Sequence, residues 1–152
     1  MQNNVFKKNN YGWLILLVFS VFALCENQVN ANEVATSTRT SSIDLSISFS
    51  NSRSRFTPDS ETREILLDAK DASMIIINGR TSTNQPSRSD ESLALKRALS
   101  ARRYLIKKGV SPLKIMINYA SAVDYITDNS TPEGRLENQR VDIELIFVST
   151  YK

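Results

Sequence analysis

The chain has 152 residues, of which 41% are hydrophobic and 23% are charged, and its formal net charge at pH 7 is +3. This length fits one globular domain plus a short extra segment. The absence of histidine and the presence of one cysteine exclude Ser–His and Cys–His catalytic pairs, His-ligated zinc and an intrachain disulfide. A dedicated nucleic-acid binder would show a strong basic excess, and the four glycines stand too far apart for a phosphate-binding loop. We expect a protein that is not an enzyme and uses no cofactor, metal or nucleic acid.

The N-terminus has the layout of an export signal. Lys7 and Lys8 precede an apolar run from Trp13 to Cys25, which is shorter than the roughly 20 residues of a membrane span. Residues 1–31 are one predicted signal peptide, with cleavage after the small residue Ala31. Two alternatives stay open: a lipoprotein signal that ends before Cys25, which would then be lipidated, or an uncleaved anchor. All three possibilities put the rest of the chain outside the cytoplasm and limit contact with the membrane to the N-terminal segment.

Two elements are predicted in the first half of the body. Residues 32–42 are polar and rich in Ser and Thr, which indicates a linker. From Ile43 to Phe49 apolar and polar residues alternate, as in a half-buried strand. After a polar loop, Asp59 or Ser60 begins a helix with acidic residues in its first turns, and this helix continues to Ala69.

The second half contributes a long helix and three strands. Met74–Ile77 is a continuous apolar run, typical of a central strand buried on both faces. Ser89 or Asp90 caps a helix that extends to about Lys108 and ends at a C′ glycine, Gly109. The remaining predicted elements are a strand at 115–119, a short helix at 133–139, a strand at 141–148 and a tail at 149–152.

The resulting order, β-α-β-α-β-(α)-β, predicts an α+β fold. We expect a mixed sheet of about four strands with the two main helices on one face. The long helix has one broad apolar arc that should face this sheet, and a second apolar stripe made of Leu95, Leu99 and Ile106. Either another segment covers this stripe, or the stripe is a protein-binding surface.

Motifs between residues 75 and 147 resemble the OmpA C-terminal-like domain, which also occurs in Pal lipoproteins and the flagellar motor protein MotB. The family's strand, G-H-T-D turn and helix motif correspond to Gly79-Arg80-Thr81-Ser82 followed by Asp90, Leu93-Ala94 and Arg97-Ala98. Its E-G-R-x-x-N-R-R-V block corresponds to Glu133-Gly134-Arg135 and Asn138-Gln139-Arg140-Val141. The two blocks together are specific, and the resemblance covers 43–148 as the domain.

The resemblance implies a periplasmic or outer-membrane protein that binds peptidoglycan. In this family an aspartate and an arginine hold the ammonium and the carboxylate at the diaminopimelate terminus of the stem peptide, an arrangement that suits an arginine fork. Carried over by position, Arg97 pairs with the carboxylate, close to the Gly79–Ser82 turn and at the start of the long helix. Thr81, Ser82, Asp90, Asn138 and Arg140 complete the implied ligand-binding set.

The aspartate position is occupied by Ser82, so the charge-assisted half of the recognition is lost. The difference between charged and neutral hydrogen bonds predicts a cost of about 1–2 kcal/mol, roughly ten-fold in affinity. Three readings therefore stay open. In the first, the chain binds peptidoglycan weakly. In the second, it is an accessory subunit of a type IV-like secretion complex or of a motor complex, and it contacts other envelope proteins. In the third, Arg97 and Arg140 are structural residues, and Arg97 ties its helix to the loop after Met74–Asn78.

Overall fold

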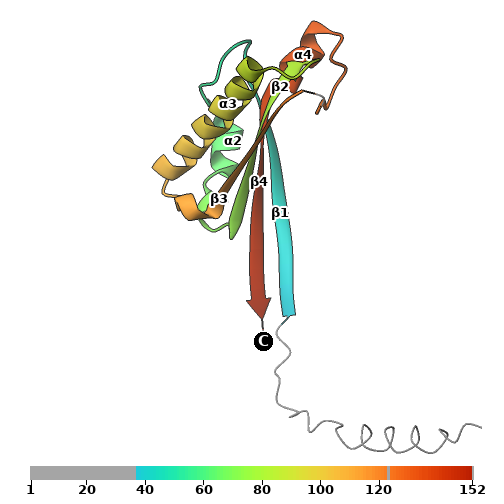
Figure 1. Cartoon of the computed structure of the whole chain (residues 1–152). Coiled ribbons are helices and arrows are strands. Elements are labelled where there is room, and N and C mark those ends of the chain that lie inside the picture. Colours follow the sequence, from blue (N-terminus) through green and yellow to red (C-terminus); the bar gives the residue numbers. More distant parts are fainter. Residues whose placement is uncertain (1–36, 123, 152) are drawn as a thin grey trace, which may run out of the picture. The chain divides into compact units, whose positions relative to one another are not determined.

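Four strands form one mixed sheet in the order β1-β4-β2-β3 (Figure 1). The computed structural model describes residues 37–122 and 124–151, so the predicted signal and Cys25 lie outside the described residues. β1 pairs antiparallel with β4, β4 antiparallel with β2, and β2 parallel with β3. The strand bounds are β1 Ser37–Ser48, β2 Met74–Thr83, β3 Ile115–Ala122 and β4 Arg140–Tyr151.

Three α-helices and two 3-10 turns connect the strands. The helices are α2 (Ser60–Ile65), α3 (Arg88–Lys107) and α4 (Pro132–Asn138), and the 3-10 turns η1 and η2 are Asp68–Lys70 and Pro112–Lys114. Side chains of Asp59, Ser87 and Thr131 cap the three α-helices. Gly109 follows α3 with φ 94°, a left-handed conformation that glycine adopts without strain.

α2 and α3 lie on one face of the sheet, as predicted (Figure 1). Alternate residues of β2 and β4 point at the helices, and they pack with small residues of α3 that let the helix approach closely. The buried core there includes Ile75, Ile77, Val141, Ile143 and Leu145 of the sheet and Ala98, Ala101 and Leu105 of α3. The α+β fold predicted from the sequence is confirmed.

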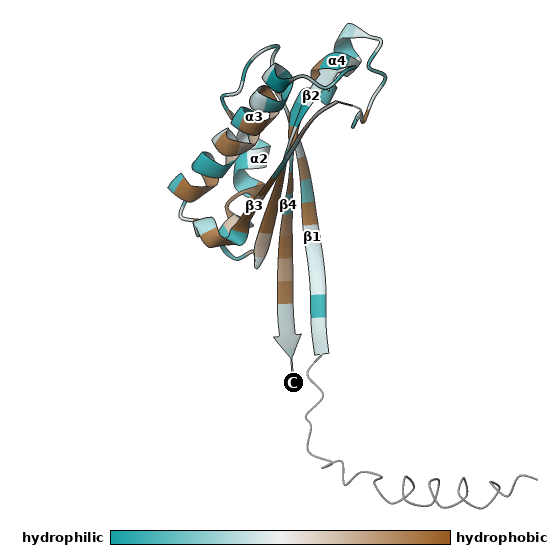
Figure 2. Cartoon of the chain, in the orientation of Figure 1, coloured by the Kyte–Doolittle hydropathy of each residue, from teal (hydrophilic) through white to brown (hydrophobic). Residues whose placement is uncertain are grey.

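The structure corrects several predicted boundaries. The helix predicted to continue to Ala69 ends at Ile65 and is followed by the 3-10 turn η1, and the cap of α3 is Ser87 rather than Ser89 or Asp90. Residues 37–42, predicted as the end of a linker, belong to β1, and residues 149–151, predicted as a tail, belong to β4. Ser37 pairs with Tyr151 and Ser42 with Ile146, and Figure 2 shows that this part of β1 has intermediate hydropathy with one hydrophilic band and no hydrophobic one. These pairs are held by the backbone ladder rather than by buried side chains, so hydrophobic alternation gave no signal for them.

The prediction that Met74–Ile77 is buried on both faces was half right. β2 is a central strand with neighbours on both sides, and Ile75 and Ile77 are fully buried. Met74 and Ile76, however, are only half-buried, because they lie on the face that α2 and α3 do not cover. Within residues 37–122 and 124–151, the helices therefore cover one face of the sheet and leave the other face open.

Candidate functional site

An open cleft of about 440 Å³ lies where the loop after β1, the end of β2 and α4 meet. Ser82 comes from the polar end of strand β2, and Asn51 comes from the loop after β1. α4 and the residue that follows it supply the rest of the wall. The lining residues are Asn51, Ser82, Pro132, Arg135, Leu136 and Gln139.

Arg97 lies behind this cleft and is completely buried. Its Nε donates to the carbonyl oxygen of Arg53 at 2.9 Å, its Nη1 to that of Arg80 at 2.8 Å, and its Nη2 to Oε1 of Gln139 at 3.1 Å. Its guanidinium also stands 5.2 Å from the centre of the Phe49 ring, within the range of a cation–π contact. Arg97 thus joins α3 to the loop after β1, to β2 and to the residue after α4.

The charge of Arg97 is not balanced by an ion pair among the described residues, since its three recorded acceptors are neutral oxygens. Burial lowers the pKa of Arg97 to about 10, and the negative charge of Asp90 opposes that shift. The guanidinium therefore stays protonated at neutral pH. An uncompensated positive charge behind a cleft wall attracts anions into the cleft.

Two expectations about the position of Arg97 were only partly correct. Arg97 was expected close to residues 79–82, and it does donate a hydrogen bond to the backbone of Arg80. It was also expected at the start of the long helix, but it lies in the middle of α3, because the helix begins at Arg88 and is capped by Ser87. Residues 79–82 are not a turn: β2 continues to Thr83. The strand continues because Gly79 and Arg80 remain paired with Tyr119 and Ala120 of β3.

Arg140 and Arg80 belong to an ion cluster rather than to the cleft wall. Nε of Arg140 donates to Asp142 at 2.9 Å, and its Nη1 donates to the carbonyl oxygen of Asp124 at 3.0 Å. Arg80 pairs with the Asp124 carboxylate. The pair with Asp124 balances the charge of Arg80, which stands where the family's turn has a histidine.

Asn138, Asp90 and Thr81 all have partners within the fold. Asn138 is fully buried; its Oδ1 accepts from the backbone of Ile126 at 2.9 Å, and its Nδ2 donates to Thr127 at 3.1 Å. Asp90 accepts from the capping Ser87 hydroxyl, and the Thr81 hydroxyl is 3.1 Å from that of Thr83. Of the six predicted ligand residues, the structure places only Ser82 in the wall of the cleft.

Sequence reasoning missed most of the wall. Gln139 stands where the family has an arginine, and this departure was the one available signal for it. Arg135 belongs to the E-G-R block but was not assigned to the ligand set, and Asn51 gave no signal, because only the fold brings the loop after β1 beside α4. Nη1 of Arg135 donates to the carbonyl oxygens of Asn129 and Ser130 at 3.3 and 2.6 Å, which holds this exposed cation at the cleft.

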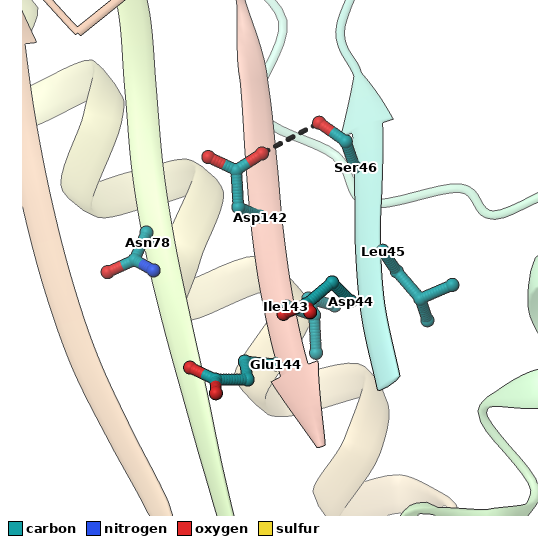
Figure 3. Close-up of a pocket in the computed structure, with 7 residues that line it drawn as sticks. All are labelled: Asp44, Leu45, Ser46, Asn78, Asp142, Ile143 and Glu144. Carbon is teal, nitrogen blue, oxygen red and sulfur yellow. Dashed lines mark hydrogen bonds between the residues drawn. The ribbon is translucent and has the colours of Figure 1, made fainter. Parts of the chain in front are cut away.

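A second hollow lies on the open face of the sheet (Figure 3). Asp44 of β1 is directly opposite Glu144 of β4, so two carboxylates meet across the strands without a recorded ion pair. Asp142 lies next to them and accepts from the Ser46 hydroxyl at 2.7 Å. Like charges directly opposite are unfavourable in a sheet, and this acidic strip borders the half-buried Met74 and Ile76.

The predicted stripe of Leu95, Leu99 and Ile106 is partly buried, and Ile106 packs against the core. In the part of the chain that the structure describes, no helix is long and apolar enough to cross a membrane. The same residues contain no group of three or more metal-ligating side chains of the His, Cys, Asp or Glu type.

Curated proteins with similar sequences come from the bacterial outer membrane. A protein of Brucella suis, named as an outer membrane lipoprotein of a type IV secretion system, is 40% identical over 72 residues, which are 47% of this chain and 42% of that protein. Outer membrane protein A of Bordetella avium is 35% identical over 78 residues, or 51% and 40% of the two chains. The matches therefore span less than half the length of these relatives.

Two solved structures share the fold. The OmpA-like domain of FopA1 from Francisella tularensis has a TM-score of 0.56 at 17% identity, covering 74% of this chain and 78% of that one. The peptidoglycan-associated lipoprotein of Burkholderia pseudomallei has a TM-score of 0.56 at 20% identity, covering 64% and 86%. A family model described as the OmpA family matches residues 49–139, which include the loop after β1, Arg97 and the cleft-lining residues up to Gln139. The chain belongs to the OmpA family.

Proposed function

We propose that this chain is a non-enzymatic protein of the cell envelope that binds peptidoglycan through the cleft between Ser82 and α4. The observation that carries the proposal is the position of Arg97, whose buried positive charge lies directly behind the cleft residue Gln139. A stem-peptide carboxylate that enters the cleft is attracted by this charge and by Arg135, and it can replace Gln139 as the acceptor of Nη2. Membership of the OmpA family supports the same role.

Binding should be weak, because the cleft offers no carboxylate for the ammonium beside the ligand carboxylate. We expect the exported protein to sediment with isolated sacculi at low salt and to be released at moderate salt, since salt screens exposed charge pairs. Arg135→Gln should reduce the bound fraction several-fold. Arg103→Gln, which removes the same charge from the exposed side of α3, is the matched control and should bind like the wild type.

A protein that stays in the supernatant at low salt, or an Arg135→Gln variant that binds as well as the control, would contradict this use of the cleft. Substitution of Arg97 is less informative for binding, because Arg97 also holds three segments of the fold together. The binding test therefore rests on Arg135, whose recorded contacts are to neighbouring exposed backbone.

A second candidate function is that of an accessory subunit in a type IV secretion assembly of the envelope. The 40% identity to the Brucella suis protein favours it, and the open face of the sheet, with an acidic strip beside half-buried apolar residues, offers a contact surface. The stripe of Leu95, Leu99 and Ile106 is a smaller surface, since it is partly buried.

A photo-crosslinking residue placed at Ile76 tests this role in cells that carry the secretion genes. We expect a specific adduct with another envelope protein from position 76 and none from position 103, which is exposed on the far side of α3. Deleting the secretion genes should remove the adduct. Equal labelling from both positions, or an adduct that persists in the deletion strain, would count against a secretion partner on the open face.

A further inference from the structure

The chemistry of the cleft wall limits which form of the stem peptide it can hold. None of its described lining residues is acidic; Asn51, Ser82 and Gln139 are neutral hydrogen-bonding groups, and Arg135 is a cation. Of the acids in the surrounding segments, Asp124 is paired with the two arginines of the ion cluster, and Asp90 and Asp128 accept from Ser87 and Ser130. Glu133 and Glu137 of α4 are exposed and are not among the lining residues. The lining itself therefore carries a positive charge and no negative one.

Gln139 connects this wall to the buried charge. Its Oε1 accepts from Arg97 at 3.1 Å, its side chain is 8% exposed, and it lines the cleft. A ligand in the cleft therefore feels two cations, Arg97 behind the wall and Arg135 on it. A ligand carboxylate is favoured by both, whereas a ligand ammonium is repelled by both and finds no anion among the described lining residues.

The hydroxyl of Ser82 is the group in the cleft wall that can bond the nitrogen of the ligand. Its backbone is held in place, since the carbonyl oxygen of Ser82 accepts from Nδ2 of Asn129 at 2.8 Å. The side chain is one neutral hydroxyl, which can accept from an N–H. An amide N–H needs only such a neutral acceptor, while an ammonium transferred out of water without an anion pays a much larger desolvation cost.

We infer that the cleft selects a carboxylate whose neighbouring nitrogen is acylated, over the same carboxylate beside a free ammonium. In peptidoglycan this chemistry is found where the side-chain amine of diaminopimelate has been acylated by the terminal D-alanine of another stem, which is the cross-link itself. This inference rests on the proposed function and specifies its ligand: the cross-linked stem rather than the unlinked one. Acylation removes the one charge that the cleft repels.

The test compares two soluble muropeptides that differ at one nitrogen. The exported protein is titrated calorimetrically at low salt with a disaccharide tetrapeptide whose diaminopimelate amine is free, and with the same compound after acetylation of that amine. We expect the acetylated compound to bind about ten-fold more tightly. Both compounds carry the same terminal D-alanine carboxylate, so a preference between them cannot come from that end of the peptide. A cross-linked dimer should bind like the acetylated monomer.

Ser82→Asp should reverse the preference, because a carboxylate at this position pairs with the ammonium. Ser111→Asp adds the same charge at an exposed position outside the cleft, where the side chain makes no capping bond, and should leave the preference unchanged. If the compound with the free amine binds the protein as tightly as the acetylated compound does, the inference about cross-linked stems is wrong, while the proposed function stands. Failure of both compounds and of the dimer to bind would overturn the proposed function as well.

Discussion

Gly79→Ala is expected to destabilise the protein by about 3 kcal/mol. A Cβ at this position would stand 2.1 Å from the backbone oxygen of Ala94 and 3.2 Å from Cβ of Ala98. Both residues are fully buried in α3, and a backbone oxygen cannot rotate away as a side chain can. The whole helix would have to move off β2, which loosens the core between them. Urea denaturation followed by circular dichroism measures the loss.

Gly109→Ala is the matched control for this change. Its φ of 94° makes alanine strained, at about 1–2 kcal/mol, but the added Cβ would meet only the end of the Lys70 side chain at 3.4 Å. We expect the Gly79 variant to lose clearly more stability than the Gly109 variant. If the order is reversed, close approach of α3 to β2 is not what requires a glycine at position 79.

Arg97→Ala is expected to cost about 3–5 kcal/mol, a large part of the 5–15 kcal/mol that is usual for a domain. The change leaves buried oxygens of Arg53, Arg80 and Gln139 without their donor and creates a cavity beside Phe49. Arg97→Lys should recover less than half, because one ammonium cannot reproduce the planar guanidinium. Faster amide hydrogen exchange at Phe49 and Phe56 should accompany the loss.

Arg103→Ala, on the exposed side of the same helix, should change stability by less than about 0.5 kcal/mol. The pKa of Arg97 is lowered in the folded state, so its protonation opposes folding below pH 10, and this unfavourable contribution fades only as the pH rises above 10. Between pH 6 and 9 both states are charged, and the effect of Arg97→Ala should stay constant. If the Arg97→Ala variant is as stable as the Arg103→Ala control, Arg97 does not hold the three segments together.

Several features of the fold follow from local sequence. The apolar run at Met74–Ile77 and the glycine after α3 are each specified within a few residues, and the start of α3 was predicted to within two or three residues of its cap, Ser87. The paired blocks around Arg97 and Arg140 pointed to the OmpA family, which the family match confirmed. Local pattern sufficed here because hydrophobic periodicity and capping depend on neighbours in the chain.

The first residues of β1 and the last of β4 were not visible in the sequence. Ser37–Ser42 has no apolar alternation, and its strand conformation comes from a backbone ladder with residues 146–151. Such pairing depends on a segment that lies about a hundred positions away in the chain, so no local pattern reports it. The open face of β2 was hidden for a similar reason: the sequence shows that Met74 and Ile76 are apolar, but not that α2 and α3 both cover the other face.

The sequence determined the family, and it singled out Ser82 and Arg97 as the positions on which the predictions about the ligand depend. Only the tertiary structure decided what Arg97 does, because its three acceptors come from the loop after β1, from β2 and from Gln139. It likewise gave Arg140 and Asn138 partners within the fold and put Asn51 and Arg135 into the cleft wall. A side chain's charge and size can be read from its letter, but its partners are fixed by folding, which brings distant segments within hydrogen-bonding distance.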